Sequence, residues 1–272
     1  MANELITHVK ELGEVVQSNG NWLTNVQDSK GRIITPRNEA YARLQTIGEK
    51  DIGKSYGTRT SAGFEHAKEQ FPLVRLRSQL LNKSLAEKAV AANNNGNYFS
   101  TQTTKEYEQS LEEAEEEMKK EPKDWNVFTL PSRSKMTMSN TENWNVYEAF
   151  LNDQAKPYFE LNGPITIYPV DEKTVDAQDG TLLTQLWFGS LDCGSGFNGG
   201  SRSLHYDYDR ARWVRKKSAT GTQKIFSPEE IKVPYTQREI TKNVDILQGV
   251  RDGNLPASKL EQVVAFFGKL KQ

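Results

Sequence analysis

The chain has 272 residues, of which 36% are hydrophobic and 10% aromatic, and this aromatic content excludes wholesale disorder despite a mean hydropathy of −0.72. Its net charge of −1, from 35 basic and 36 acidic residues, excludes attachment to nucleic acid by bulk charge alone. A single cysteine and three scattered histidines exclude an internal disulfide bond and give no spacing typical of metal ligands.

The beginning of the chain is expected to combine helices with one hairpin. Apolar residues at steps of three and four predict an amphipathic helix over residues 2–18. Residues 22–35 are predicted to form a hairpin around the turn-forming residues 28–31. A short helix over 37–47 and a polar, glycine-rich loop over 48–63 follow in this prediction.

Two longer helical patterns occupy the next sixty residues. The first covers 64–92, where leucines recur along one side, and Pro72 is expected to start or kink its main part. The second covers 103–120 and is dominated by glutamates, with few apolar positions. Such a run is usually a solvated face, and its alternative function would be to mimic a basic partner.

After Pro122 the pattern changes to short strands. A helix over 141–151 interrupts them, and two apolar stripes separated by Gly253 and Pro256 predict a helical hairpin over 236–272. The predicted strands are 126–130, 135–139, 164–170, 182–191 and 203–214.

We therefore predict an α+β fold with a helix-rich N-terminal half, a mainly antiparallel β section and a C-terminal helical hairpin. The corresponding regions are 1–122, 123–235 and 236–272. They could also form one domain.

The segment from Gly48 to Ser55 matches G-x-x-x-x-G-K-[ST], in which backbone amides and a lysine hold phosphates and a hydroxyl binds Mg²⁺. Such a loop works between a buried strand and a helix N-terminus. The preceding residues lack the continuous apolar character of a buried strand, and the following residues lack a helical pattern. A surface loop is the simpler interpretation, and a phosphate site at Gly53, Lys54 and Ser55 is the alternative.

A second glycine pattern, G-x-G-x-x-G, is formed by Gly194, Gly196 and Gly199. A dinucleotide-binding fold would place a helix after it, whereas a strand-like segment follows. A protein kinase is excluded because the chain lacks the H-R-D and D-F-G sequences. We expect a hairpin tip whose glycines adopt positive φ, with phosphate binding as the alternative.

Cys193 could serve as a nucleophile if His205 lay close enough to act as its base. The neighbouring carboxylate of Asp192 would raise the pKa of the thiol and weaken it as a nucleophile. A lone cysteine is more often an inert packing residue, and this is the role we expect.

The segment 202–217 alternates aromatic and charged residues and ends in basic ones. Arginine binds phosphate oxygens in a forked geometry and exposed aromatic rings stack on bases, so one strand could present both. Alternatively, the aromatic rings face the core and the arginines pair with carboxylates. The candidate nucleic-acid-binding residues are Arg202, Tyr206, Tyr208, Arg210, Arg212, Trp213, Arg215, Lys216 and Lys217.

These patterns favour a non-enzymatic subunit or binding module of a larger assembly, nucleoprotein or viral-particle-like. Its expected partners are other protein subunits, with nucleic acid as a further candidate, and we predict no cofactor and no metal. No stretch approaches the roughly 18 apolar residues of a membrane span, and no secretory pattern is found, so we expect a cytoplasmic protein. The alternative is an enzyme that acts on a nucleotide or another phosphate-containing substrate through a glycine-rich loop.

Overall fold

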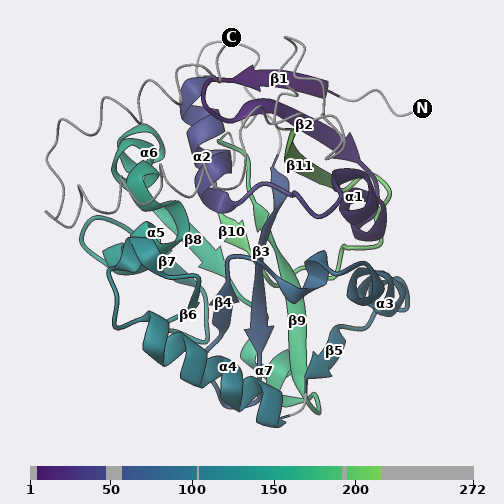
Figure 1. The fold of residues 1–272 in the computed structure, drawn as a ribbon. Coiled ribbons are helices and arrows are strands. Elements are labelled where there is room, and N and C mark those ends of the chain that lie inside the picture. Colours follow the sequence, from purple (N-terminus) through teal and green to yellow (C-terminus); the bar gives the residue numbers. More distant parts are fainter. Residues whose placement is uncertain (1–4, 47–56, 103, 192–194, 216–272) are drawn as a thin grey trace, which may run out of the picture. The chain divides into compact units, whose positions relative to one another are not determined.

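An eleven-stranded mixed sheet organises the residues that the computed structural model describes, which are 5–46, 57–102, 104–191 and 195–215 (Figure 1). All of them belong to one compact unit, Met1–Lys217. The strands are β1 (Leu5–Val9), β2 (Gly13–Asn19), β3 (Thr58–His66), β4 (Leu73–Arg75), β5 (Phe99–Gln102), β6 (Val127–Thr129), β7 (Met136–Met138), β8 (Ile165–Tyr168), β9 (Thr181–Phe188), β10 (Phe197–Asn198) and β11 (Arg210–Arg215).

Seven α-helices and three short 3₁₀ turns accompany the sheet in the described part of the chain. The helices are α1 (Trp22–Ser29), α2 (Pro36–Gln45), α3 (Lys83–Asn94), α4 (Thr104–Glu117), α5 (Trp144–Leu151), α6 (Ala155–Asn162) and α7 (Glu172–Asp176). The 3₁₀ turns are η1 (Gln79–Leu81), η2 (Pro122–Asp124) and η3 (Asn152–Gln154).

The main path through the sheet follows the order β1-β2-β11-β3-β9-β10-β8-β7. Branches add β4 beside β3, β6 beside β4, and β5 beside β9. Most neighbours are antiparallel, and the parallel pairs are β10 with β8 and β11 with β3. The strand β11 comes last in sequence among these but lies between β2 and β3. This placement brings residues 210–215 into the sheet between β2 and β3.

The prediction of a helix-rich N-terminal half is wrong, because five strands of the sheet precede residue 122. Within the predicted helix over 2–18, the described residues 5–18 are not helical. Instead β1 and β2 pair as a hairpin, and Glu11 and Gly13 take positive φ at its turn. The β-branched residues Val9, Val15 and Val16 suit strands better than helices, and their burial in the sheet outweighed the helical spacing. The helical hairpin predicted for 236–272 lies outside the described residues.

Residues 22–35 do not form the predicted hairpin, because α1 occupies most of them. Its N-terminus is capped by Asn21, whose side chain accepts a hydrogen bond of 3.0 Å from the amide of Thr24. The helix ends at Lys30, which adopts the left-handed conformation typical of a helix C-terminus. Asn21 is the signal that could have identified this helix from the sequence.

The central strand β3 replaces the second part of the predicted loop over 48–63 and the start of the predicted helix over 64–92. All nine of its residues are buried, although Thr58, Arg59, Thr60 and Ser61 are polar. They can be buried because partners in neighbouring strands and loops satisfy them; for example, Ser61 donates to the carbonyl of Leu76 at 2.7 Å. Residues 47–56, the first part of that loop, lie outside the described residues.

Several other predicted elements are confirmed. The helix α2 occupies the position predicted over 37–47, and α4 and α5 occupy those predicted over 103–120 and 141–151. Strands β6, β7 and β8 lie within their predicted ranges, and β9 begins one residue before its predicted range and ends within it. By contrast, only residues 210–214 of the predicted strand over 203–214 are extended, as part of β11.

The hydrophobic core lies on both faces of the sheet. In β9, Leu186 and Phe188 belong to one buried cluster, whereas Leu183 belongs to another. This division follows from the alternation of side chains along a strand. The first cluster includes buried residues of α5, such as Phe150, and the second includes Trp22 of α1.

Candidate functional site

A groove of about 480 Å³ opens beside the centre of the sheet. We call it the tyrosine groove, and its lining residues are Arg59, Trp187, Asn198, Ser201, Ser203, Tyr206, Tyr208, Asp209 and Arg210. Three of them, Tyr206, Tyr208 and Arg210, belong to the site predicted from the sequence.

Two strand junctions position the groove. Asn198 of β10 lies opposite Trp187 of β9 in an antiparallel pair, so both residues reach the same end of these strands. Next to them, Ala211 of β11 pairs with Arg59 of β3 in parallel. The connection from β10 to β11, residues 199–209, therefore passes β9 and β3, and it carries both tyrosines of the groove.

A buried ion pair lies at the base of the groove. The Nε atom of Arg59 donates to the Asp209 carboxylate at 2.8 Å, and both side chains are almost fully buried. The remaining nitrogens of Arg59 donate to the carbonyl of Gln185 at 2.9 Å and to the hydroxyl of Ser203. Its guanidinium also lies 5.4 Å from the ring centroid of Trp187. One arginine thus links strands β3 and β9 to the 199–209 loop.

Further hydrogen bonds hold this loop against α1 and α3. The amide of Gly20 donates to the carbonyl of Asp209 and the amide of Trp22 to that of Leu204, both at 2.8 Å. The amide of Leu204 donates to the side chain of Asn93 at 3.2 Å. A loop fixed at so many points presents its side chains in a defined arrangement.

Tyr206 and Tyr208 form the exposed wall of the groove. Their rings are stacked, with centroids 4.9 Å apart and planes 15° from parallel. Tyr208 is 72% exposed and Tyr206 is 40% exposed. The His205 ring lies against Tyr206, with centroids 4.2 Å apart. Two large aromatic rings are therefore exposed to solvent. Stacking on each other removes only part of their apolar surface from water.

The other predicted nucleic-acid-binding residues do not gather at the groove. Arg202 is exposed and donates to the carbonyl of Gly96 at 2.6 Å, with its guanidinium 5.2 Å from the Tyr98 ring centroid. Arg215 lies 3.6 Å from the carboxylate of Glu14. Lys216 and Lys217 lie outside the described residues.

Arg212 and Trp213 are buried in the fold. The side chain of Arg212 is 2% exposed and donates to Glu39, and two of its nitrogens also donate to the Gln17 side-chain oxygen at 2.9 and 3.0 Å. Burial lowers the pKa of Arg212 to about 10, while the Glu39 carboxylate opposes this shift. Trp213 is also buried and bridges to Ile33 through its backbone. In this conformation neither side chain offers a surface to a phosphate or a base, which corresponds to the alternative interpretation of the segment.

A second arginine shares the same carboxylate. Arg43 donates to Glu39 at 2.8 Å, to the hydroxyl of Tyr158 at 3.0 Å and to the carbonyl of Gly189 at 2.7 Å. Its guanidinium lies 4.0 Å from the centroid of Phe188. No local pattern in the sequence indicates this cluster, because its members come from α2, α6, β11 and the residues after β9.

The described glycines of the second pattern serve packing. The predicted hairpin between 182–191 and 203–214 is wrong, because β3 separates β9 from β11, and β9 instead pairs with the short strand β10 inside the predicted loop. Gly196 and Gly199 do not adopt positive φ, so the prediction that these glycines are needed for that backbone conformation is also wrong. A Cβ atom at Gly199 would lie 2.3 Å from the Phe64 ring, so only glycine fits there. Gly53, Lys54, Ser55, Cys193 and Gly194 lie outside the described residues.

The described residues contain no group of three histidine, cysteine, aspartate or glutamate side chains placed to hold a metal ion. Among the described helices, none has the length and apolar character needed to cross a membrane. Sequence reasoning missed Arg59, Trp187 and Asp209 as groove residues. For Arg59, the useful signal would have been the two flanking β-branched residues, Thr58 and Thr60.

Comparisons with known proteins give a fold and no family. The chain matches no family model and no curated protein. A solved structure described by the phrase "Accommodation of massive sequence variation in Nanoarchaeota by the C-type lectin fold" is similar, with a TM-score of 0.50 and 14% sequence identity. The match covers 78% of this chain and 99% of that one. In place of the predicted arrangement, the described part of this chain therefore resembles the C-type lectin fold, built on one large mixed sheet with a few helices.

Proposed function

We propose that this protein is a non-enzymatic binding module that recognises a partner protein through the tyrosine groove. The observation that carries this proposal is the stacked pair of exposed rings, Tyr206 and Tyr208, on the rim of a groove with Trp187 and Arg210 in its lining. Tyrosine, tryptophan and arginine are the residues most enriched at protein interfaces and among their energetic hot spots.

The rigidity of the loop supports the same function. The ion pair between Arg59 and Asp209 and the backbone hydrogen bonds to Gly20 and Trp22 hold the loop before any partner arrives. A preorganised surface loses little conformational entropy on binding, and tyrosine adds a large contact area with only two rotatable side-chain bonds.

The similar solved structure is described as an example of a C-type lectin fold that accommodates massive sequence variation. A scaffold that tolerates such variation suits a binding module, because recognition residues can change on loops while the sheet keeps its shape. In this chain the two exposed tyrosines of the groove lie on a loop, whereas the lining residues Arg59 and Trp187 belong to strands of the sheet.

Contact with a nucleic-acid backbone is the less favoured alternative. Arg210, Tyr206 and Tyr208 remain together at the groove, but Arg212 and Trp213 are buried and Arg215 lies beside Glu14. The larger assembly expected from the sequence stays a prediction.

The test is to isolate the full-length tagged protein from its source cells and to quantify by mass spectrometry the polypeptides that co-purify with it. We expect a fixed-ratio partner whose recovery falls about 30-fold with Tyr206→Ala/Tyr208→Ala, the loss equivalent to about 2 kcal/mol that is typical of a hot spot. Phe71→Ala is the matched control, because Phe71 is also an exposed aromatic residue and lies outside the groove.

Equal recovery with the double variant and the wild type would contradict the proposal, and so would the absence of any fixed-ratio polypeptide. Recovery of nuclease-sensitive nucleic acid that falls with the double variant, and weakens with salt, would instead support the nucleic-acid alternative.

A further inference from the structure

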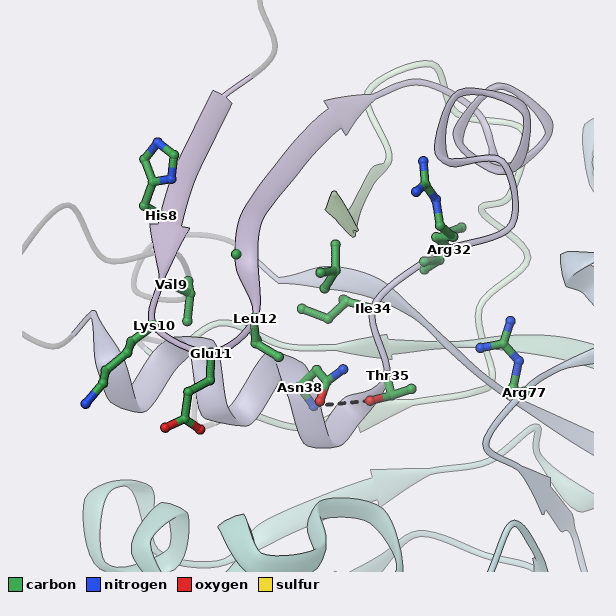
Figure 2. A pocket seen from close by; sticks show the side chains of 13 residues that line it. His8, Val9, Lys10, Glu11, Leu12, Arg32, Ile34, Thr35, Asn38 and Arg77 are labelled. Atoms are coloured by element: carbon green, nitrogen blue, oxygen red, sulfur yellow. Dashed lines mark hydrogen bonds between the residues drawn. The ribbon is translucent and has the colours of Figure 1, made fainter. Parts of the chain in front are cut away.

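A second and larger cavity, of about 870 Å³, lies around the turn between β1 and β2 and the start of α2 (Figure 2). We call it the turn pocket. It shares no lining residue with the tyrosine groove, and its residues are His8, Val9, Lys10, Glu11, Leu12, Gly13, Arg32, Ile33, Ile34, Thr35, Asn38, Arg77 and Val214.

The middle of the turn pocket is apolar. Val9, Ile33 and Ile34 are buried members of the core that also line the cavity, and Leu12 and Val214 are partly buried beside them. Its volume falls within the range of about 300–1,000 Å³ that is typical of small-molecule sites. An aliphatic chain would bury against these side chains with a favourable transfer free energy.

The rim of the pocket is cationic. Figure 2 shows Arg32 and Arg77 on one side of Ile34, with Lys10 and Glu11 on the other. Glu11 is the only carboxylate among the lining residues, against Lys10 and the two arginines. In the described part of the chain, none of these three cations forms an ion pair, although Arg77 donates to the carbonyl of Gly31 at 3.3 Å.

The shape of the pocket is set by the fold. The amide of Ile34 donates to the carbonyl of Arg212 at 2.8 Å, which fixes the apolar segment against β11. Thr35 caps α2 by accepting from the amide of Asn38 at 3.2 Å, as the dashed line in Figure 2 shows. The backbone of the apolar segment is therefore held in place without a ligand, and Arg32 and Arg77 present exposed side chains beside it.

We propose that the turn pocket binds a free anionic amphiphile, a carboxylate with an aliphatic chain. Its chain lies on Leu12, Ile34 and their apolar neighbours, and its carboxylate accepts hydrogen bonds from Arg32 and Arg77. Guanidinium groups suit this acceptor because their planar fork matches the two oxygens of a carboxylate. The uneven charge of the rim selects an anion over a neutral molecule of the same length.

The experiment is calorimetric titration of the full-length protein with dodecanoate and with dodecanol, both below their aggregation concentrations. We expect one dodecanoate per chain and at least tenfold weaker binding of dodecanol. Decanoate should bind about 15-fold more weakly than dodecanoate, since each buried methylene contributes about 0.8 kcal/mol, or about fourfold in affinity.

The variant Arg32→Ala/Arg77→Ala should bind dodecanoate about as weakly as wild type binds dodecanol. Lys83→Ala/Lys88→Ala removes the same charge from exposed positions on α3 outside the pocket and should leave dodecanoate binding unchanged. Both variants change exposed residues, so both should fold.

Equal affinities for dodecanoate and dodecanol would overturn the proposal. So would unchanged binding after Arg32→Ala/Arg77→Ala, equal losses in the two double variants, or no binding at millimolar dodecanoate. Binding to phosphatidylglycerol vesicles without binding to free dodecanoate would indicate that the cationic rim contacts a lipid surface. That result would also contradict the proposal of a free ligand.

Discussion

Arg212 and Glu39 form a buried ion pair that joins the last described strand to the second helix, across 173 residues of sequence. The carboxylate of Glu39 is fully buried and also accepts from Arg43, so two cations share one anion inside the protein. Its second oxygen has no hydrogen-bond partner among the described residues. Charges in such a place are tolerated only while they compensate each other.

Glu39→Gln should therefore be strongly destabilising. The amide keeps the size of the side chain but leaves two buried guanidinium groups without an anion. We expect the free energy of unfolding to fall by about 3–5 kcal/mol, the usual cost of breaking a buried ion pair from one side. Urea denaturation followed by tryptophan fluorescence measures this change.

Glu142→Gln is the control for Glu39→Gln, because Glu142 is exposed and forms no ion pair within the described residues. Its free energy of unfolding should stay within about 0.5 kcal/mol of wild type. Similar losses of unfolding free energy in both variants would contradict the view that Glu39 compensates the charges of Arg43 and Arg212.

Arg59→Lys should weaken both the fold and the groove. The guanidinium of Arg59 reaches Asp209, Gln185 and Ser203 together, whereas an ammonium group is a single point and cannot span these partners. We expect a loss of about 2–4 kcal/mol in unfolding free energy, measured in urea, because the Asp209 carboxylate loses its fitted partner. Faster hydrogen exchange at the amides of 203–209 should accompany it.

Arg133→Lys provides the comparison for Arg59→Lys. Arg133 pairs with Asp176 at 2.5 Å near the surface, where water can replace a lost hydrogen bond. In the Arg133→Lys variant, the free energy of unfolding and the hydrogen exchange of the 203–209 amides should be close to those of wild type. Unchanged exchange in Arg59→Lys would contradict the view that this arginine positions the loop.

The parts of the fold that could be predicted are those decided by neighbouring residues. Met136 and Met138 alternate with polar residues, as do Ile165 and Ile167, and these strands were predicted correctly. In the first eighteen residues, the positions of the apolar residues fit an amphipathic helix and a pair of strands equally well. Their pairing with β11, from Glu14 opposite Arg215 onward, decides between the two.

The site could be predicted only in part, for a similar reason. The aromatic character of 202–217 drew attention to Tyr206 and Tyr208, but nothing local distinguishes Tyr208, which is exposed, from Trp213, which is buried. That difference arises because 201–209 forms turns beside the sheet, whereas 210–215 enters it between β2 and β3. The partners Arg59 and Asp209 are 150 residues apart, so their pairing has no local signature.

His66 should make the protein less stable in mild acid. It is buried in β3, stacked on Phe64 and 3.4 Å from the hydroxyl of Thr184, and burial lowers its pKa to about 3. In the unfolded chain its pKa is about 6.5, so between these values the unfolded state binds the proton that the folded state excludes. Stability is retained above about pH 6.5 and falls as the pH decreases toward 3.

The expected contribution of His66 is a loss of about 2 kcal/mol in unfolding free energy between pH 7 and pH 5. Urea denaturation at both pH values should show this slope in wild type, and His66→Gln should reduce it by that amount. An unchanged slope in His66→Gln would mean that the buried imidazole accepts a proton more readily than its surroundings indicate.

Gly199→Ala should destabilise the protein through packing. The added Cβ would lie 2.3 Å from Cδ2 and 2.4 Å from Cε2 of Phe64, whose buried ring has little space to move. We expect a loss of about 1–3 kcal/mol, as in other overpacked cores, measured by urea denaturation. Gly196→Ala is the matched comparison, because its Cβ would lie 3.2 Å from the exposed ring of Tyr168, which can turn aside.

The direct test of this contact is a double-mutant cycle. Phe64→Leu alone should destabilise by removing ring contacts, but combined with Gly199→Ala it should lose less than the sum of the two single variants, because leucine leaves room for the new methyl group. Additive losses would show that the two positions do not interact. In that case the close approach of Gly199, just after β10, to the ring of Phe64 in β3 would not explain the glycine at this position.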